Sequence, residues 1–153
     1  ALAKHLRYGT VDAWDISEKA LEVARDNANN NNVSIKFSNV NVLEPVNIDK
    51  HFDIIVSNPP YITFSEKSEL EKNVLDFEPH EALFAPDEES LIFYNKIADI
   101  AVKILNDKGY LYFEINQAKG SDIIELLKSK GFSNIELRKD ISGNNRMIRG
   151  MKP

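Results

Sequence analysis

The chain contains the sequence Phe52-Asp53-Ile54-Ile55-Val56-Ser57-Asn58-Pro59-Pro60-Tyr61, in which an apolar segment runs into two consecutive prolines. A short apolar run of this kind predicts a strand that is buried on both faces of a parallel sheet. Because proline cannot donate to a strand ladder, we expect the chain to leave the sheet at Asn58. Ligands of open α/β sheets bind beyond the carboxyl ends of the strands, so residues 58–61 form a candidate site.

The composition predicts one soluble globular domain over residues 1–153. The sequence has no cysteine, which excludes disulfides and thiolate metal sites, and the three histidines are scattered, so we expect no metal. No apolar run has membrane-spanning length and no signal peptide is visible, so we expect a cytoplasmic protein without a membrane partner. The net charge of -5 argues against direct binding of nucleic acid.

Strand and helix patterns alternate along the chain, which predicts a doubly wound α/β fold. Before residue 52 we expect a helix tail at 1–6, a strand at 10–15, a helix capped by Ser17, a polar turn at 29–32 and a half-buried strand at 33–37. After residue 61 we expect an insertion to residue 87 with a short helix at 66–74, a helix at 91–105, an exit turn at 106–109, a strand at 110–115, a helix at 121–130 closed by Gly131, and strands at 135–137 and 146–151. The last two strands are expected to form a hairpin-like end.

Asp15 is a second candidate, because it ends its strand just before a helix. A carboxylate in this place can accept hydrogen bonds from both ribose hydroxyls of a nucleoside cofactor. The alternative is that Asp15 only caps the helix, and the residue alone leaves both roles open.

Residues 58–61 are suited to holding a planar –NH2 group. Each proline restricts the residue before it to extended geometry, so the turn is stiff. Loop carbonyls and the side-chain oxygen of Asn58 can accept hydrogen bonds, and Tyr61 offers a flat face. A loop with a purely structural role is the alternative.

Several segments strengthen this interpretation because they occur in a characteristic order around the loop. They are residues 11–21, Phe77-Glu78-Pro79-His80-Glu81-Ala82-Leu83-Phe84, Glu114-Ile115-Asn116-Gln117 and Asp140-Ile141-Ser142-Gly143-Asn144-Asn145-Arg146. Residues 58–61 are similar to the signature of S-adenosylmethionine-dependent methyltransferases that act on planar nitrogens. With the other segments, essentially the whole chain resembles the protein-(glutamine-N5) methyltransferases of peptide-chain release factors, the PrmC/HemK family.

This resemblance implies a Rossmann-like class I methyltransferase fold, with a mostly parallel sheet and an antiparallel last strand. It also implies S-adenosyl-L-methionine as the cofactor and the Gly-Gly-Gln glutamine of a release factor as the substrate. The cofactor-binding residues would be Asp15 on the ribose, Ile16, Asn41 and Val42 near the adenine, and Asn58. The residues that bind the substrate amide and carry catalysis would be Asn58, Pro59, Pro60 and Tyr61.

The chain departs from the family pattern in several places. Asn41 stands where the family usually has Asp, Val42 where an aromatic is frequent, and Asn116 where Gly is usual. The family's helical domain, first strand and Gly-rich turn precede the helix that Ala1 enters, so we expect a carboxyl-terminal fragment. The missing strand would lie between the strands at 10–15 and 52–57.

Two other functions remain open from the sequence. An adenine-N6 methyltransferase of DNA or RNA would use the same loop for a flipped base, although the acidic composition counts against it. The other alternative is a binding module, or a fragment that no longer binds the cofactor. Because the family's Gly-rich turn is absent from the sequence, we expect this chain by itself to bind S-adenosyl-L-methionine weakly or not at all. Glu78 and Glu114 are expected to be structural rather than catalytic.

Overall fold

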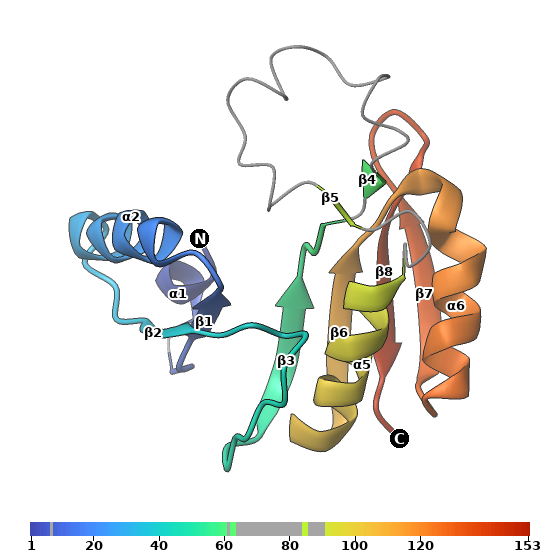
Figure 1. Ribbon diagram of the computed structural model, residues 1–153, viewed down its shortest axis with the longest axis horizontal. Helices are drawn as coiled ribbons and strands as arrows, with labels where there is room; N and C mark the ends of the chain where they lie inside the picture. The colour runs from blue at the N-terminus through green and yellow to red at the C-terminus, as the bar shows by residue number, and fades with distance from the viewer. Residues whose placement is uncertain (7, 61, 64–83, 86–90) are drawn as a thin grey trace. The chain divides into compact units, whose positions relative to one another are not determined.

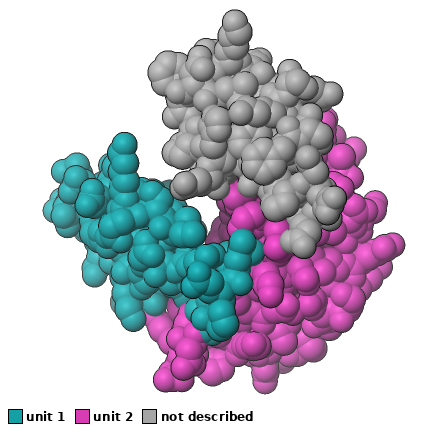
Figure 2. All heavy atoms as spheres, in the orientation of Figure 1, with its two compact units in different colours: residues 1–46 teal, residues 47–153 magenta. Residues whose placement is uncertain are grey.

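The computed structural model describes residues 1–6, 8–60, 62–63, 84–85 and 91–153 (Figure 1). The expected helix at 66–74 and the segment around Glu78 lie outside these residues. Contacts within the chain divide it into two compact units, Ala1–Val46 and Asn47–Pro153, which Figure 2 colours separately.

The first unit consists of α1 (Leu2–His5), β1 (Asp12–Asp15), α2 (Glu18–Asn30) and β2 (Lys36–Asn39). The two strands pair in parallel, with Asp15 opposite Asn39. Ser17 caps α2 as predicted, since its hydroxyl oxygen accepts a hydrogen bond from the Ala20 amide at 3.3 Å. Leu21 is buried on the inner side of the helix.

The strand after α2 begins later than predicted, at Lys36 instead of Val33. The helix itself continues to Asn30, so the predicted turn at 29–32 is also displaced. Asn32 takes a positive φ of 53, and the Val33 amide donates to the Ala28 carbonyl at 3.0 Å. Val33 therefore closes the helix and cannot join the strand ladder.

The second unit contains a four-stranded sheet in the order β3-β6-β8-β7. Its elements are β3 (Phe52–Ser57), β4 (Ile62–Thr63), β5 (Phe84–Ala85), α5 (Ile92–Ile104), β6 (Leu105–Glu114), the 3-10 helix η3 (Gln117–Lys119), α6 (Gly120–Ser129), β7 (Ser133–Lys139) and β8 (Asn145–Met151). β3 and β6 are parallel, β8 is antiparallel to both of its neighbours, and β4 pairs separately with β5. The predicted hairpin-like end is confirmed as the β7–β8 pair.

The carboxyl ends of β3, β6 and β7 meet at one edge of this sheet. β8 is antiparallel to β6 and to β7, so β7 runs in the same direction as β6 and β3. Asn58, Asn116 and Asp140 follow just beyond the ends of these strands. We call this side of the sheet the carboxyl edge.

Helices α5 and α6 cover the same face of the sheet (Figure 1). Tyr94 of α5 packs edge-on against Phe113 of β6, with ring centroids 5.1 Å apart. Leu127 of α6 lies close to Gly150 of β8, where an added Cβ would be 3.5 Å from it. Phe113 pairs with Ile148 of β8, and Gly150 lies two residues further along that strand. Paired residues, and residues two apart in a strand, face the same side of a sheet, so both helices contact one face. Tyr94, Phe113 and Leu127 are each at most 1% exposed and belong to its core.

β3 lies at the border of the sheet, with β6 on one side and no other described strand on its second side. Ile54 and Val56 are 55% and 59% exposed. The prediction of burial on both faces is therefore wrong for this strand. The physical reason is that α5 and α6 cover the other face of the sheet.

The predicted exit turn at 106–109 is part of the sheet in the structure. Strand β6 begins at Leu105, directly after α5, and these residues form an irregularity opposite Asp53. Asn106 Nδ2 donates to Asp53 Oδ1 at 2.8 Å, and Lys108 has a positive φ of 62 within the strand. The prediction of an exit turn is therefore wrong, because these residues form an irregularity within strand β6.

Candidate active site

The proline turn lies at the carboxyl edge of the second unit. β3 ends at Ser57, which confirms that the chain leaves the strand at Asn58. Asn58 is exposed, whereas Pro59 is buried and Pro60 is half-buried. The buried proline anchors the turn in the protein and leaves the amide of Asn58 accessible to a ligand. Tyr61 lies outside the residues that the structure describes.

The end of β6 contributes structural contacts to the same edge. The Tyr94 hydroxyl donates to the Glu114 carbonyl at 3.2 Å, and this bond ties α5 to the end of the strand. Asn116 Oδ1 accepts a hydrogen bond from the Ala118 amide at 3.0 Å and so caps the 3-10 helix η3. The side chain of Asn116 therefore stabilises the turn that follows β6.

The loop between β7 and β8 completes the carboxyl edge, and we call residues 140–144 the hairpin loop. Asp140 Oδ1 accepts hydrogen bonds from the amides of Ser142 at 2.9 Å and Asn144 at 3.0 Å. Asp140 Oδ2 accepts a hydrogen bond from Arg146 Nε at 3.3 Å. The pKa of Asp140 is held below its ordinary value chiefly by the hydrogen bond from the Asn144 amide. The hydrogen bond from Arg146 lowers this pKa further.

This lowered pKa predicts a stability loss in acid. A carboxylate whose pKa is lower in the folded than in the unfolded protein stabilises the fold at pH values above its unfolded pKa, which is about 4. This stabilisation is lost as the pH falls from there through the folded pKa. We expect Asp140→Asn to be less stable than the parent near pH 7, with a difference that shrinks towards about pH 3. Urea unfolding at both pH values measures this, and a difference that stays constant with pH would contradict it. Asp26→Asn is the matched control, because it makes the same chemical change at an exposed position of α2.

In the first unit, Asp15 lies exposed at the carboxyl end of β1. Its Oδ1 accepts a hydrogen bond from the Ser17 amide at 2.8 Å, while Ser17 itself is the N-cap of α2. The carboxylate thus orders the start of the helix, and its remaining acceptor sites can still bind a ligand hydroxyl. Ile16 is 55% exposed, and its carbonyl accepts from Asn39 Nδ2 at 2.8 Å.

Asn41 and Val42 follow β2 at the same edge of the two-stranded sheet. Asn41 Oδ1 accepts a hydrogen bond from the Leu43 amide at 3.0 Å, and Nδ2 donates to Glu44 Oε1 at 3.1 Å. The side chain of Asn41 is therefore engaged in its own turn. The first unit brings Asp15, Ile16, Asn41 and Val42 to one edge, and the second unit holds Asn58, Pro59 and Pro60.

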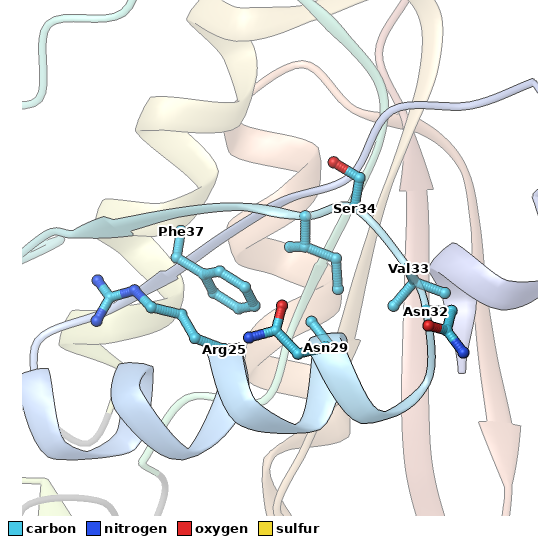
Figure 3. A pocket seen from close by; sticks show the side chains of 8 residues that line it. Arg25, Asn29, Asn32, Val33, Ser34 and Phe37 are labelled. Atoms are coloured by element: carbon cyan, nitrogen blue, oxygen red, sulfur yellow. The ribbon is translucent and has the colours of Figure 1, made fainter.

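A pocket that the sequence did not predict lies between α2 and the segment that leads into β2 (Figure 3). Its lining includes Arg25, Asn29, Val33 and Phe37, and the Arg25 guanidinium lies 6.0 Å from the centre of the Phe37 ring. These residues are at the amino end of β2, whereas Asp15 is at the carboxyl end of β1, which runs parallel. The pocket is therefore separate from the predicted cofactor residues. The apolar alternation at 33–37 was the sequence signal for its wall.

Two further properties concern the described part of the chain alone. None of its helices is both long and apolar enough to cross a membrane. Its histidine and acidic side chains form no group of three or more that could hold a metal ion.

Comparison with known proteins confirms the resemblance that the motifs predicted. Proteins named release factor glutamine methyltransferase from Flavobacterium psychrophilum and Bacteroides thetaiotaomicron are 50% and 46% identical to the chain over 149 residues. Each match covers 97% of this chain, but 52% and 54% of the respective relative. The chain thus spans about half the length of these curated relatives.

Solved structures confirm the predicted fold class. A methyltransferase from Pyrococcus furiosus has a TM-score of 0.70 at 20% identity, and the match covers 99% of this chain and 66% of that protein. The N-methyltransferase NodS from Bradyrhizobium japonicum, in complex with S-adenosyl-L-homocysteine, has a TM-score of 0.58 at 16% identity, covering 94% of this chain and 67% of NodS. The fold is that of the Rossmann-like class I methyltransferases. Residues 1–77 match the family model of the methyltransferase small domain, so the chain belongs to the methyltransferase small domain family.

Proposed function

We propose that the protein transfers a methyl group from S-adenosyl-L-methionine to the side-chain nitrogen of the Gly-Gly-Gln glutamine in a peptide-chain release factor. The observation that carries this proposal is the exposed amide of Asn58 beside the buried Pro59 at the carboxyl end of β3. The names of the relatives support the choice of a release factor as the substrate. The cytoplasm, which the sequence suggested as the location, stays a prediction.

The amide nitrogen of glutamine is a weak nucleophile because its lone pair is delocalised. No strong base is present at Asn58, Pro59 or Pro60, so the protein must act by orienting the amide. Orientation of a reactant can supply about 7–11 kcal/mol of a barrier. The Asn58 side-chain oxygen and the Pro59 carbonyl would accept the two N–H bonds of the amide and stabilise positive charge that grows on its nitrogen. S-adenosyl-L-methionine supplies the electrophilic methyl group when it is bound.

The residues of the first unit fit the chemistry of this cofactor. Asp15 is exposed, and its bond to the Ser17 amide leaves acceptor sites for the ribose hydroxyls. Ile16 and Val42 would provide apolar contacts beside it, with the Asn41 turn near the adenine. Asn41 uses its amide for Leu43 and Glu44, so its contribution to the cofactor would be the position of its backbone.

A methyl-transfer assay tests the proposal. The protein is offered a bacterial release factor and, in separate reactions, duplex DNA, single-stranded DNA and ribosomal RNA, each with a labelled methyl donor. We expect label in the release factor only, and none after Gln→Ala in its Gly-Gly-Gln motif. Label in a nucleic acid but not in the factor would support an adenine-N6 methyltransferase and overturn the assignment.

Cofactor binding by itself is measured by calorimetry. We expect Asp15→Ala to bind S-adenosyl-L-methionine more weakly than the parent, because the ribose hydroxyls would lose their bonds to the carboxylate. Glu22→Ala is the control, because Glu22 is an exposed carboxylate within α2 and away from the carboxyl end of β1. Equal binding by Asp15→Ala and the parent would contradict the role of Asp15.

A further inference from the structure

The hairpin loop takes no part in the catalytic chemistry proposed for Asn58. It lies at the carboxyl edge of the second unit, where β7 ends, and Figure 1 shows it at the same end of the sheet as the tip of β3. The order β3-β6-β8-β7 places three strand spacings between the two ends, which is roughly 14 Å. A single glutamine side chain cannot reach across this distance, but the surface of a protein substrate can.

The hairpin loop is held in one conformation by its own hydrogen bonds. Asp140 accepts bonds from Ser142, Asn144 and Arg146, as described above, and its amide donates to the Asn144 carbonyl at 2.8 Å. The Gly143 amide donates to the Asp140 carbonyl at 3.1 Å, and Gly143 takes a φ of 86, which favours glycine. A loop that is ordered before binding loses little conformational entropy when it meets a partner.

Ile141 stands at the tip of this ordered loop and is completely exposed, with a relative exposure of 107%. None of the hydrogen bonds that order the loop needs an isoleucine side chain, since they use the backbone, Asp140 and Arg146. A single exposed apolar residue is common on protein surfaces. Ile141 differs from such a residue in that it stands on a preordered loop at the same edge of the sheet as Asn58.

We propose that the hairpin loop is a docking surface for the protein substrate, with Ile141 inserted into an apolar depression of that protein near the glutamine to be modified. This inference rests on the proposed function and extends it from the reacting side chain to the surrounding protein surface. Asn58 positions the reacting amide, and Ile141 anchors the substrate roughly 14 Å away, so that two separated contacts fix its orientation.

The charges of the hairpin loop favour a protein over a nucleic acid. Its one acidic group, Asp140, is paired with Arg146 on β8, so the two charges compensate each other. The remaining residues, Ser142, Gly143 and Asn144, are uncharged. Just before the loop, Arg138 is paired with Glu136, and the exposed Lys139 is a single cation rather than the cluster that a phosphate-binding surface needs. A phosphate backbone is bound chiefly by Lys and Arg side chains, whereas an apolar tip with a polar rim matches the composition of protein interfaces.

The test compares Ile141→Ser with the parent in methyl transfer to an intact release factor and to a short peptide that contains Gly-Gly-Gln. Burial of an isoleucine at an interface is expected to change affinity on the order of tenfold. We therefore expect Ile141→Ser to raise KM for the intact factor about tenfold, with kcat within about twofold and no change for the peptide. Val23→Ser is the matched control, because Val23 is also a β-branched residue, 56% exposed, on the outer side of α2.

Asp140→Asn provides a second variant that keeps Ile141 but weakens the ordering of the loop. It is expected to raise KM for the intact factor by a smaller factor than Ile141→Ser, because the tip must then be ordered on binding. The thermal midpoint of Ile141→Ser should equal that of the parent, since its side chain contributes nothing to the fold.

A photo-crosslinking amino acid in place of Ile141 separates the two proposals without relying on activity. An adduct with the release factor from position 141, and none from position 23, supports docking even if no methyl transfer is detected; in that case the proposed function alone fails. Methyl transfer to the factor with an unchanged KM in Ile141→Ser and no adduct would overturn the docking surface and leave the proposed function intact. Crosslinking to nucleic acid in place of protein would also overturn it.

Discussion

Replacement of Asn58 by alanine is expected to lower the rate of methyl transfer by on the order of 10²–10³-fold, the usual effect of removing one positioned catalytic hydrogen bond. The side chain is exposed at the end of β3, so its removal leaves no cavity in the core. The effect should appear mainly in kcat, because the acceptor is needed most when charge develops on the amide nitrogen.

The control for this variant is Asn30→Ala, which removes an exposed asparagine from the last turn of α2. Both variants should unfold at the same temperature as the parent, and only Asn58→Ala should lose activity. Turnover of Asn58→Ala within a few-fold of the parent, with folding intact, would mean that the proline turn has only a structural role.

Replacement of Phe113 by alanine is expected to reduce the free energy of unfolding by about 3–5 kcal/mol. Phe113 is 1% exposed and packs edge-on against Tyr94, whose ring centroid is 5.1 Å away. Its loss would open a cavity between β6 and α5 and remove the aromatic pair. Denaturant unfolding measures the change, with the midpoint and slope determined together.

Phe113→Leu is the matched control, because it retains most of the buried apolar volume and should cost much less than the alanine variant. Tyr112→Ala, on the neighbouring and half-exposed position of β6, separates a general effect on the strand from the loss of the core contact. A loss below about 1 kcal/mol in Phe113→Ala would contradict the central place of Phe113 in the core.

Local chemistry made several features of the fold predictable from the sequence. Ser17 caps α2 because its hydroxyl can reach an amide within the first turn, and Gly131 closes the end of α6 because it can take a φ of 87. The double proline ended β3 at the predicted place. Each of these helix and strand ends is determined by residues that are neighbours in the chain, so it can be predicted from the local sequence.

The features that escaped prediction depend on contacts between distant segments. The alternation at 33–37 suggested a strand, but the bond from Val33 to the Ala28 carbonyl belongs to the helix end and delays β2. The exposure of Ile54 depends on which face of the sheet α5 and α6 cover. The pocket beside Phe37 is formed jointly by α2 and the segment before β2. The hydrophobic pattern of either segment alone does not predict that the two enclose a pocket.

The same reasoning applies to the candidate site. The sequence pattern correctly placed Asp15 at the end of a strand and Asn58 directly after one, and their binding of ligands stays a prediction. The hydrogen bonds that occupy the Asn41 side chain could not be predicted, because they depend on the turn geometry after β2. The ordered tip at Ile141 also required the structure, since its exposure is a property of the folded hairpin.

The border position of β3 has a consequence for the behaviour of this chain in concentrated solution. Residues 52–57 include no lysine and no proline, the residues that commonly prevent strands from pairing with foreign chains. With Ile54 and Val56 more than half exposed, the strand combines apolar side chains with an edge that no second described strand covers. Asp53 is the one charged residue of this strand, and charge also protects strand edges, so the second unit taken by itself has at β3 a template for intermolecular sheet growth that this single charge opposes.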